Sequence, residues 1–245
     1  MLRAVAAAVL VIATGLSNAA PNDITDPHRG LTPNERAMLK PIFRDSLDYD
    51  KIQVIRGKFL LQPNHVYMTP RGNIYAPGDL WSEDFAAPSA GPYHRAVFVH
   101  EITHVWQFEN GMDLIAQGVA EFAKTGGAYE KAYPYTLAKS RDLVDYGMEQ
   151  QASIVEDYFL INNREVPQRM ENRGLGTAAR AELYSAVLGK FLGNARYARD
   201  LSPTEVAKRH AAEKTPSAKQ TCDNDVDSKE KHFCSWRFEQ PPAAH

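Results

Sequence analysis

The sequence has little cysteine, no excess of positive charge and only one long apolar run. Its 245 residues carry 28 Lys and Arg against 30 Asp and Glu, which gives a net charge of −2. A nucleic-acid partner usually requires a clustered basic surface, so this charge balance argues against one. The chain also lacks internal repeats, which argues against a repeat architecture.

Cysteine occurs only twice, at Cys222 and Cys234. A zinc site built on cysteine is therefore not expected, because only His232 lies between the two as a further ligand. In an exported protein such a pair predicts a disulfide that closes a small loop. We expect this disulfide to pin a polar C-terminal tail, residues 213–245.

The one long apolar run, residues 4–16, lies at the N-terminus. It follows Arg3 and precedes a group of small residues that ends before Pro21, which is the pattern of a secretory signal peptide. We expect residues 1–20 to be removed, and residues 21–212 to form one domain. The expected location is periplasmic or secreted, without stable membrane insertion after cleavage.

Residues 98–107 contain the pattern His-Glu-x-x-His. On a helix, His100 and His104 lie one turn apart on the same face, so both imidazoles reach one zinc ion. Glu101 is then placed to take a proton from a zinc-activated water without binding the metal. A chance match in a structural helix is the alternative. An apolar stripe along another side of the predicted helix favours zinc, because it anchors the helix and leaves the histidines free.

A catalytic zinc usually has three protein ligands and an open position for water. The third histidine of the extended motif is absent, because Asn110 stands at that position. A glutamate from a later helix is the other common solution. Glu149 is preferred, because it begins the polar side of a predicted helix over 146–159. Glu121 and Glu156 remain alternatives, and Glu156 could instead orient a ligand.

The remaining pattern predicts an α+β fold that is mainly helical, with a small antiparallel sheet before the motif helix. Thr32 begins a capping box that predicts a helix through about Asp45. Strands are expected around 52–55 and 64–68, and a turn over 69–73 leads into a returning strand at 74–75. Residues 21–30 are polar and carry no predicted element. Further helices are expected over 93–110, 113–124 and 177–192, and a short one after a capping box at Ser202.

Three separated motifs carry a family resemblance: His-Glu-Ile-Thr-His-Val-Trp-Gln, Met-Thr-Pro-Arg-Gly-Asn-Ile-Tyr upstream of it, and Glu-Gln-Gln-Ala-Ser-Ile-Val-Glu-Asp-Tyr-Phe downstream. Together they resemble a group of bacterial zincin-like proteins described as related to Vgr, the spike proteins of type VI secretion. The likeness covers about residues 31–162. It implies a gluzincin-type metallopeptidase fold with His100, His104 and Glu149 as zinc ligands, Glu101 as base, and a link to spike proteins.

The predicted function is that of an exported zinc metallopeptidase that hydrolyses peptide bonds in a protein or peptide substrate, with Glu101 as general base. Candidates for an oxyanion donor are Tyr146, Tyr158 and His94, and Asp157 is a candidate to orient an imidazole. One alternative is a catalytically silent zincin-fold binding or effector protein that uses zinc structurally. Another is a toxin or cell-wall hydrolase with the same chemistry.

Overall fold

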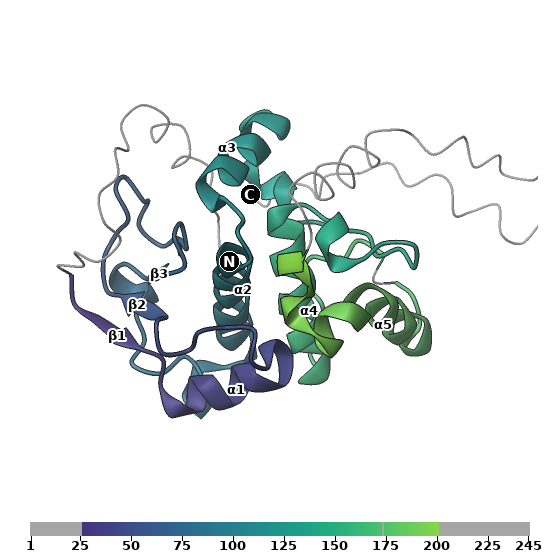
Figure 1. The fold of residues 1–245 in the computed structure, drawn as a ribbon, viewed down its shortest axis with the longest axis horizontal. Helices are drawn as coiled ribbons and strands as arrows, with labels where there is room; N and C mark the ends of the chain where they lie inside the picture. The colour runs from purple at the N-terminus through teal and green to yellow at the C-terminus, as the bar shows by residue number, and fades with distance from the viewer. Residues whose placement is uncertain (1–25, 173, 201–245) are drawn as a thin grey trace, which may run out of the picture.

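A computed structural model of the chain describes residues 26–172 and 174–200. The predicted signal peptide, the predicted helix after Ser202, the predicted tail and both cysteines lie outside these residues. The described part is an α+β fold in which helices predominate and a small sheet lies at one side (Figure 1). No helix in this part is long and apolar enough to span a membrane.

The helices and strands fall close to the predicted ranges. The helices are α1 (Pro33–Phe43), α2 (Pro92–Glu109), α3 (Leu114–Lys124), α4 (Met148–Asn162) and α5 (Thr177–Gly193), and the strands are β1 (His28–Gly30), β2 (Gln53–Ile55) and β3 (Ile74–Tyr75). The five helices match predictions, as do β2 and β3. Strand β1 does not, because it lies in the polar segment for which no element was expected.

The small sheet precedes the motif helix as predicted, in the order β1-β2-β3. The prediction of an antiparallel sheet holds for β1 and β2 only, because β2 and β3 pair in parallel and make the sheet mixed. The strand predicted at 64–68 is reduced to one antiparallel bridge, in which Met68 and Tyr75 exchange backbone hydrogen bonds of 3.3 and 2.8 Å. Strand β1 is extended because it pairs with β2. Its own sequence gives no strand signal, which is why the prediction missed it.

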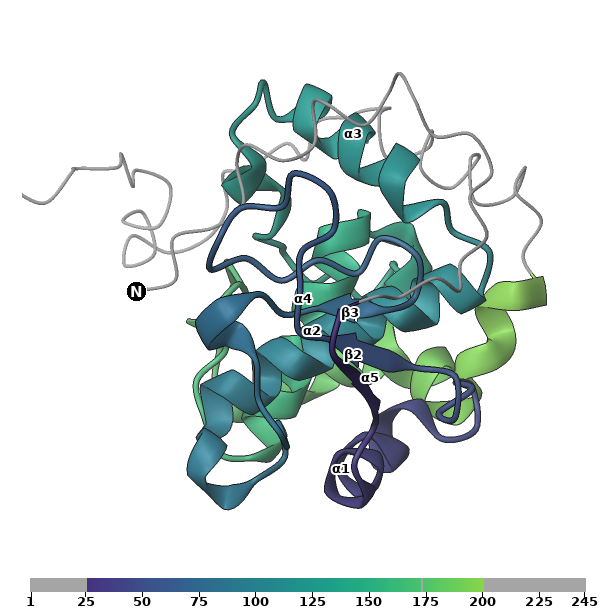
Figure 2. The same ribbon diagram turned by 90° about the vertical axis from the view of Figure 1, so that its left-hand side faces the viewer.

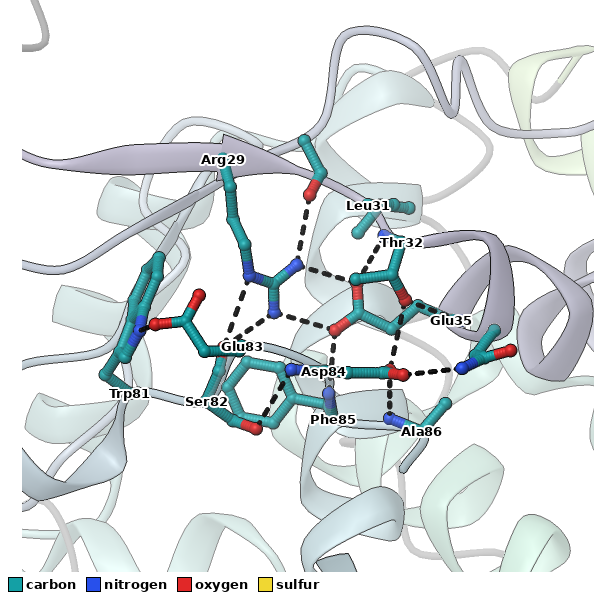
Figure 3. A network of polar contacts seen from close by, with 12 residues as sticks. Arg29, Leu31, Thr32, Glu35, Trp81, Ser82, Glu83, Asp84, Phe85 and Ala86 are labelled. Atoms are coloured by element: carbon teal, nitrogen blue, oxygen red, sulfur yellow. Dashed lines mark hydrogen bonds and ion pairs between the residues drawn. The ribbon is translucent and has the colours of Figure 1, made fainter. Parts of the chain in front are cut away.

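A buried carboxylate ties β1, α1 and the loop before α2 together (Figure 3). Glu35, the third residue of α1, forms the predicted capping box with Thr32. The Glu35 side chain is fully buried, and both terminal nitrogens of Arg29 donate hydrogen bonds to its carboxylate, at 2.9 and 2.8 Å. The backbone N–H of Phe85 donates to the same carboxylate at 2.8 Å. The network therefore fixes the N-terminal half of the fold against the loop that leads into α2.

Helices α2 and α4 pack side by side at the centre of the fold. The sheet lies on one side of this pair and α5 on the other, while α1 lies below α2 in this view (Figure 1). Figure 2 shows α3 at the opposite end of the molecule from α1. As a result α2 is buried on all sides from Phe98 to Gln107, including the face that carries the histidines. The sequence predicted a helix with one anchored side, and neighbours on both sides bury the rest.

Candidate metal centre

Three predicted side chains meet between α2 and α4. The Nε2 atom of His100 lies 3.1 Å from Oε2 of Glu149, and Nε2 of His104 lies 3.3 Å from the same oxygen. All three side chains are buried, and their ligand atoms lie within 4.8 Å of one another. Helix α2 supplies the histidines one turn apart, and the first turn of α4 supplies the carboxylate. This group could hold a metal ion.

The second ring nitrogen of His100 is held by another glutamate of α4. Its Nδ1 atom lies 3.0 Å from Oε2 of Glu156. Glu156 lies two turns after Glu149 on the same face of the helix, so one helix face contacts both nitrogens of the ring. A proton on Nδ1 is then donated to Glu156, which leaves Nε2 as the atom that can bind a metal. Glu156 therefore occupies the orienting position that the sequence offered as its second role.

The second ring nitrogen of His104 is held by an amide. Its Nδ1 lies 2.8 Å from Oε1 of Gln107. The amide nitrogen of Gln107 donates to the backbone oxygen of Met148 at 2.9 Å and to Oε1 of Gln151 at 3.0 Å. Because both amide protons are used there, the oxygen faces the imidazole and accepts from Nδ1. Gln107 was missed by the sequence analysis, although its spacing of three residues from His104 on one helix is a usable signal.

Glu149 has a fixed orientation. The hydroxyl of Tyr129 donates to Oε1 of Glu149 at 2.8 Å, which leaves Oε2 facing the two histidines. Glu121, which the sequence offered as an alternative ligand, instead accepts from the backbone N–H groups of Met148 and Glu149 at the start of α4. A Cβ atom at position 147 would lie 2.8 Å from Oε1 of Glu121, so Gly147 permits this close approach. Glu121 thus supports the helix terminus that carries Glu149.

Glu101 lies beside the histidines and is buried. The hydroxyl of Thr69, in the turn before β3, donates to its Oε2 at 2.7 Å. Burial raises the pKa of Glu101 above its usual value, against the opposing effect of His104 and His100. A raised pKa makes the carboxylate a stronger base. Thr69 was missed by the sequence analysis, because it is distant along the chain and carries no local signal.

The charges of the cluster are strongly coupled. Burial alone would lower the pKa of His100, but hydrogen bonds to Glu149 and Glu156 outweigh it and raise the pKa to about 10. Burial opposes ionisation of Glu149, yet His104 and His100 hold its pKa well below the usual range. Without a metal ion, the cluster therefore holds a proton between a histidine and Glu149 at neutral pH. A bound cation would replace that proton.

The orienting role considered for Asp157 is wrong. Its carboxylate accepts from the hydroxyl of Tyr135 and from the backbone N–H groups of Gln168, Arg169 and Met170. Asp157 faces away from the histidines because it lies one position after Glu156 on α4, about 100° around the helix axis. It fixes the 168–170 segment instead.

The three candidate oxyanion donors make other contacts. The hydroxyl of Tyr146 bonds the backbone of residues 136 and 138. The ring of His94 stacks on Phe85 with centroids 5.2 Å apart, and Tyr158 lies beside Tyr184. The structure instead places Tyr133 near the cluster, buried, with its ring centroid 5.8 Å from that of His100. No motif of the sequence pointed to this tyrosine.

The donor set fits zinc. Two neutral imidazoles and one carboxylate are the ligands of a common class of catalytic zinc sites, which keep a further position open. Both imidazoles present Nε2 because their Nδ1 atoms are engaged by Glu156 and Gln107. Oxygen-only cations such as Mg²⁺ are disfavoured by two nitrogen donors.

Comparison with known proteins identified one relative by sequence. No protein-family model matches the chain. The type VI secretion system spike protein VgrG2b of Pseudomonas aeruginosa is 33% identical over 137 residues, which cover 55% of this chain and 13% of that protein. The solved effector domain of Pseudomonas aeruginosa VgrG2b aligns with a TM-score of 0.49 and 29% identity, over 67% of this chain and 82% of that one. The chain is homologous to a part of this much longer spike protein.

Proposed function

We propose that this chain is an exported zinc-dependent peptidase. The observation that carries the proposal is the convergence of Nε2 of His100, Nε2 of His104 and Oε2 of Glu149, with the Glu101 carboxylate beside them. This combination supplies three ligands and one separate base, which is the minimum set for zinc-assisted hydrolysis. The histidines are oriented by dedicated partners, as a functional metal site requires.

Each residue of the site would have a separate role in peptide hydrolysis. Zinc bound by the three ligands would acidify a water molecule and polarise a substrate carbonyl. Glu101 would accept the proton of the attacking water and pass it to the amine that leaves when the peptide bond breaks. Its Oε2 accepts from Thr69, so Oε1 is the oxygen that takes this proton. Thr69 would keep the carboxylate in place through both transfers.

The homology supports a biological setting. VgrG2b is a type VI spike protein, and its solved domain is described as an effector domain. We infer that this chain is likewise an effector with a link to type VI secretion, working in the periplasm or outside the cell. The predicted signal peptide supports the location outside the cytoplasm, and it bears on export alone.

Peptide hydrolysis tests the proposal. A proteome-derived peptide library is incubated with zinc-loaded wild type and with Glu101→Gln, and products are identified by mass spectrometry. We expect cleavage by wild type and a loss of at least about a hundredfold in Glu101→Gln, because a general base contributes roughly 10²–10⁴-fold. Both proteins should retain one zinc ion, because Glu101 is not a ligand.

Two outcomes would redirect the proposal. Equal cleavage by wild type and Glu101→Gln would contradict the role of Glu101. Full zinc occupancy without any cleavage would favour a catalytically silent protein that uses the metal structurally.

A further inference from the structure

A groove of about 800 Å³ lies between residues 70–71, the end of α2 and the start of α3. Phe108 lines it and follows His104 by four residues on α2, so the groove begins about 6 Å further along the same helix face. Pro70 lines the other side and directly follows Thr69, the partner of Glu101. Two lining residues of the groove are thus close in sequence to residues of the proposed site, and its volume is that of a ligand pocket.

Apolar side chains line the groove, and the 69–72 turn packs closely against one of them. Phe108 is 41% exposed, which is unusual for a large ring beside a buried site. Helix α3 adds Ile115 and Val119, which lie one turn apart on one face, and Met112 precedes that helix. Opposite them, a Cβ at position 72 would lie 2.6 Å from the ring of Phe108, so Gly72 brings the 69–72 turn directly against it.

A positively charged side chain, that of Arg71, also lines the groove. Its guanidinium makes no hydrogen bond or ion pair with a residue in the described part of the chain. The acidic side chain of the groove, Asp113, already accepts from the backbone N–H of Ala116 as the N-cap of α3. Within the described residues, the groove thus offers apolar surface and the unpaired charge of Arg71, which together complement an apolar side chain next to an acidic group.

We infer that this groove is a substrate subsite that binds a bulky apolar side chain of the peptide, with an adjacent carboxylate on Arg71. The inference rests on the proposed peptidase function and deepens it by naming the substrate class. The apolar side chain loses water contact against Phe108, Ile115 and Val119. The carboxylate forms a paired, charge-assisted contact with the guanidinium. Peptides with both features, close to the bond to be cleaved, are then preferred.

Binding to a variant that does not hydrolyse tests the inference apart from activity. Zinc-loaded Glu101→Gln is titrated with fluorescein-labelled Gly-Ser peptides that carry Phe-Glu, Ser-Glu or Phe-Lys at the centre, and anisotropy is recorded. We expect Phe-Glu to bind at least about tenfold more tightly than Ser-Glu, from the burial of one large apolar side chain. It should bind about fivefold more tightly than Phe-Lys.

Two substitutions in the same Glu101→Gln background locate the binding. Ala116→Phe fills the groove and should abolish the preference for Phe-Glu over Ser-Glu. Ala123→Phe is the matched control, because Ala123 is exposed on the same helix and does not line the groove. Arg71→Glu should reverse the order of Phe-Glu and Phe-Lys. Unfolding midpoints close to that of the parent protein confirm that each variant is folded.

Several results would overturn the inference. One is that Phe-Glu and Ser-Glu peptides bind equally tightly, and another is that no peptide binds at all. A third is that Ala116→Phe and Ala123→Phe change the binding equally. A concentration-dependent dimer that only Ala116→Phe disrupts would assign the groove to a second copy of the chain instead. Failure of wild type to hydrolyse any peptide would count against the proposed function, while the binding order would still decide on the groove.

Discussion

Gln107 and His104 form a contact that decides which nitrogen of the imidazole faces Glu149. The amide oxygen of Gln107 lies 2.8 Å from Nδ1 of His104, and the amide nitrogen is held by Met148 and Gln151 on α4. Helices α2 and α4, which carry His104 and Glu149, are thereby linked through the amide that orients His104. A neutral amide in this position sets the tautomer without adding a charge.

Gln107→Ala should weaken zinc binding by about 10–100-fold, the usual effect of removing a partner of a ligand histidine. The affinity is measured by competition with a chromophoric chelator. Asn110→Ala is the matched control. It also removes a side-chain amide at the end of α2, but this amide donates to the backbone oxygen of Trp106 and does not contact His104. Equal affinities of the two variants would contradict the orienting role of Gln107.

Glu149→Ala should lose most of its zinc, whereas Glu121→Gln should keep one ion per chain. The reason is that Oε2 of Glu149 faces both histidines, while Glu121 accepts from the backbone at the start of α4. Elemental analysis of the purified proteins gives the stoichiometry. Full zinc in Glu149→Ala together with loss in Glu121→Gln would move the third ligand to α3.

Zinc binding should release about one proton at pH 7. The pKa of His100 is raised to about 10, so the metal-free cluster is protonated at neutral pH. Zinc requires the neutral imidazole, so its affinity should rise with pH until the pH exceeds that value. Calorimetric titrations in buffers with different ionisation enthalpies count the protons. Identical heats in all buffers would show that none is released.

Glu35→Gln should destabilise the fold by about 3 kcal/mol, because it leaves the partly buried Arg29 without its charged partner. The pair is part of the network around the start of α1 (Figure 3). Urea unfolding of the metal-free protein provides the measurement. Lys139→Ala breaks an ion pair whose side chains are 59% and 63% exposed, and it should cost less than about 1 kcal/mol. Similar losses of unfolding free energy in both variants would show that the network stabilises the fold no more than an exposed ion pair does.

Local patterns predicted the helices and the meeting of His100, His104 and Glu149. The spacing of His100 and His104 fixes them on one helix face whatever surrounds the helix. Glu149 was preferred over Glu121 and Glu156 because it begins the polar side of a later helix, and the structure places it against the histidines. Such inferences succeed because helix periodicity is a local property.

The rest depended on contacts between distant segments. Thr69 reaches Glu101 only because the turn before β3 folds back onto α2, and β1 becomes a strand only by pairing with β2. Asp157 and Glu156 are adjacent in the sequence, and which of them faces His100 depends on how α4 is rotated against α2. The packing of α4 against its neighbours decides that rotation. The sequence of α4 does not predict the rotation, because polar and apolar residues of this helix are both buried.

The most direct test of the account is the position of the metal itself. Crystals of the zinc-loaded protein are measured at the zinc absorption edge, and an anomalous difference map is calculated. The account predicts one strong peak bonded to Nε2 of His100, Nε2 of His104 and Oε2 of Glu149, at about 2.0–2.2 Å from each. A zinc ion bound elsewhere, or no zinc between α2 and α4 in a fully folded protein, would contradict it.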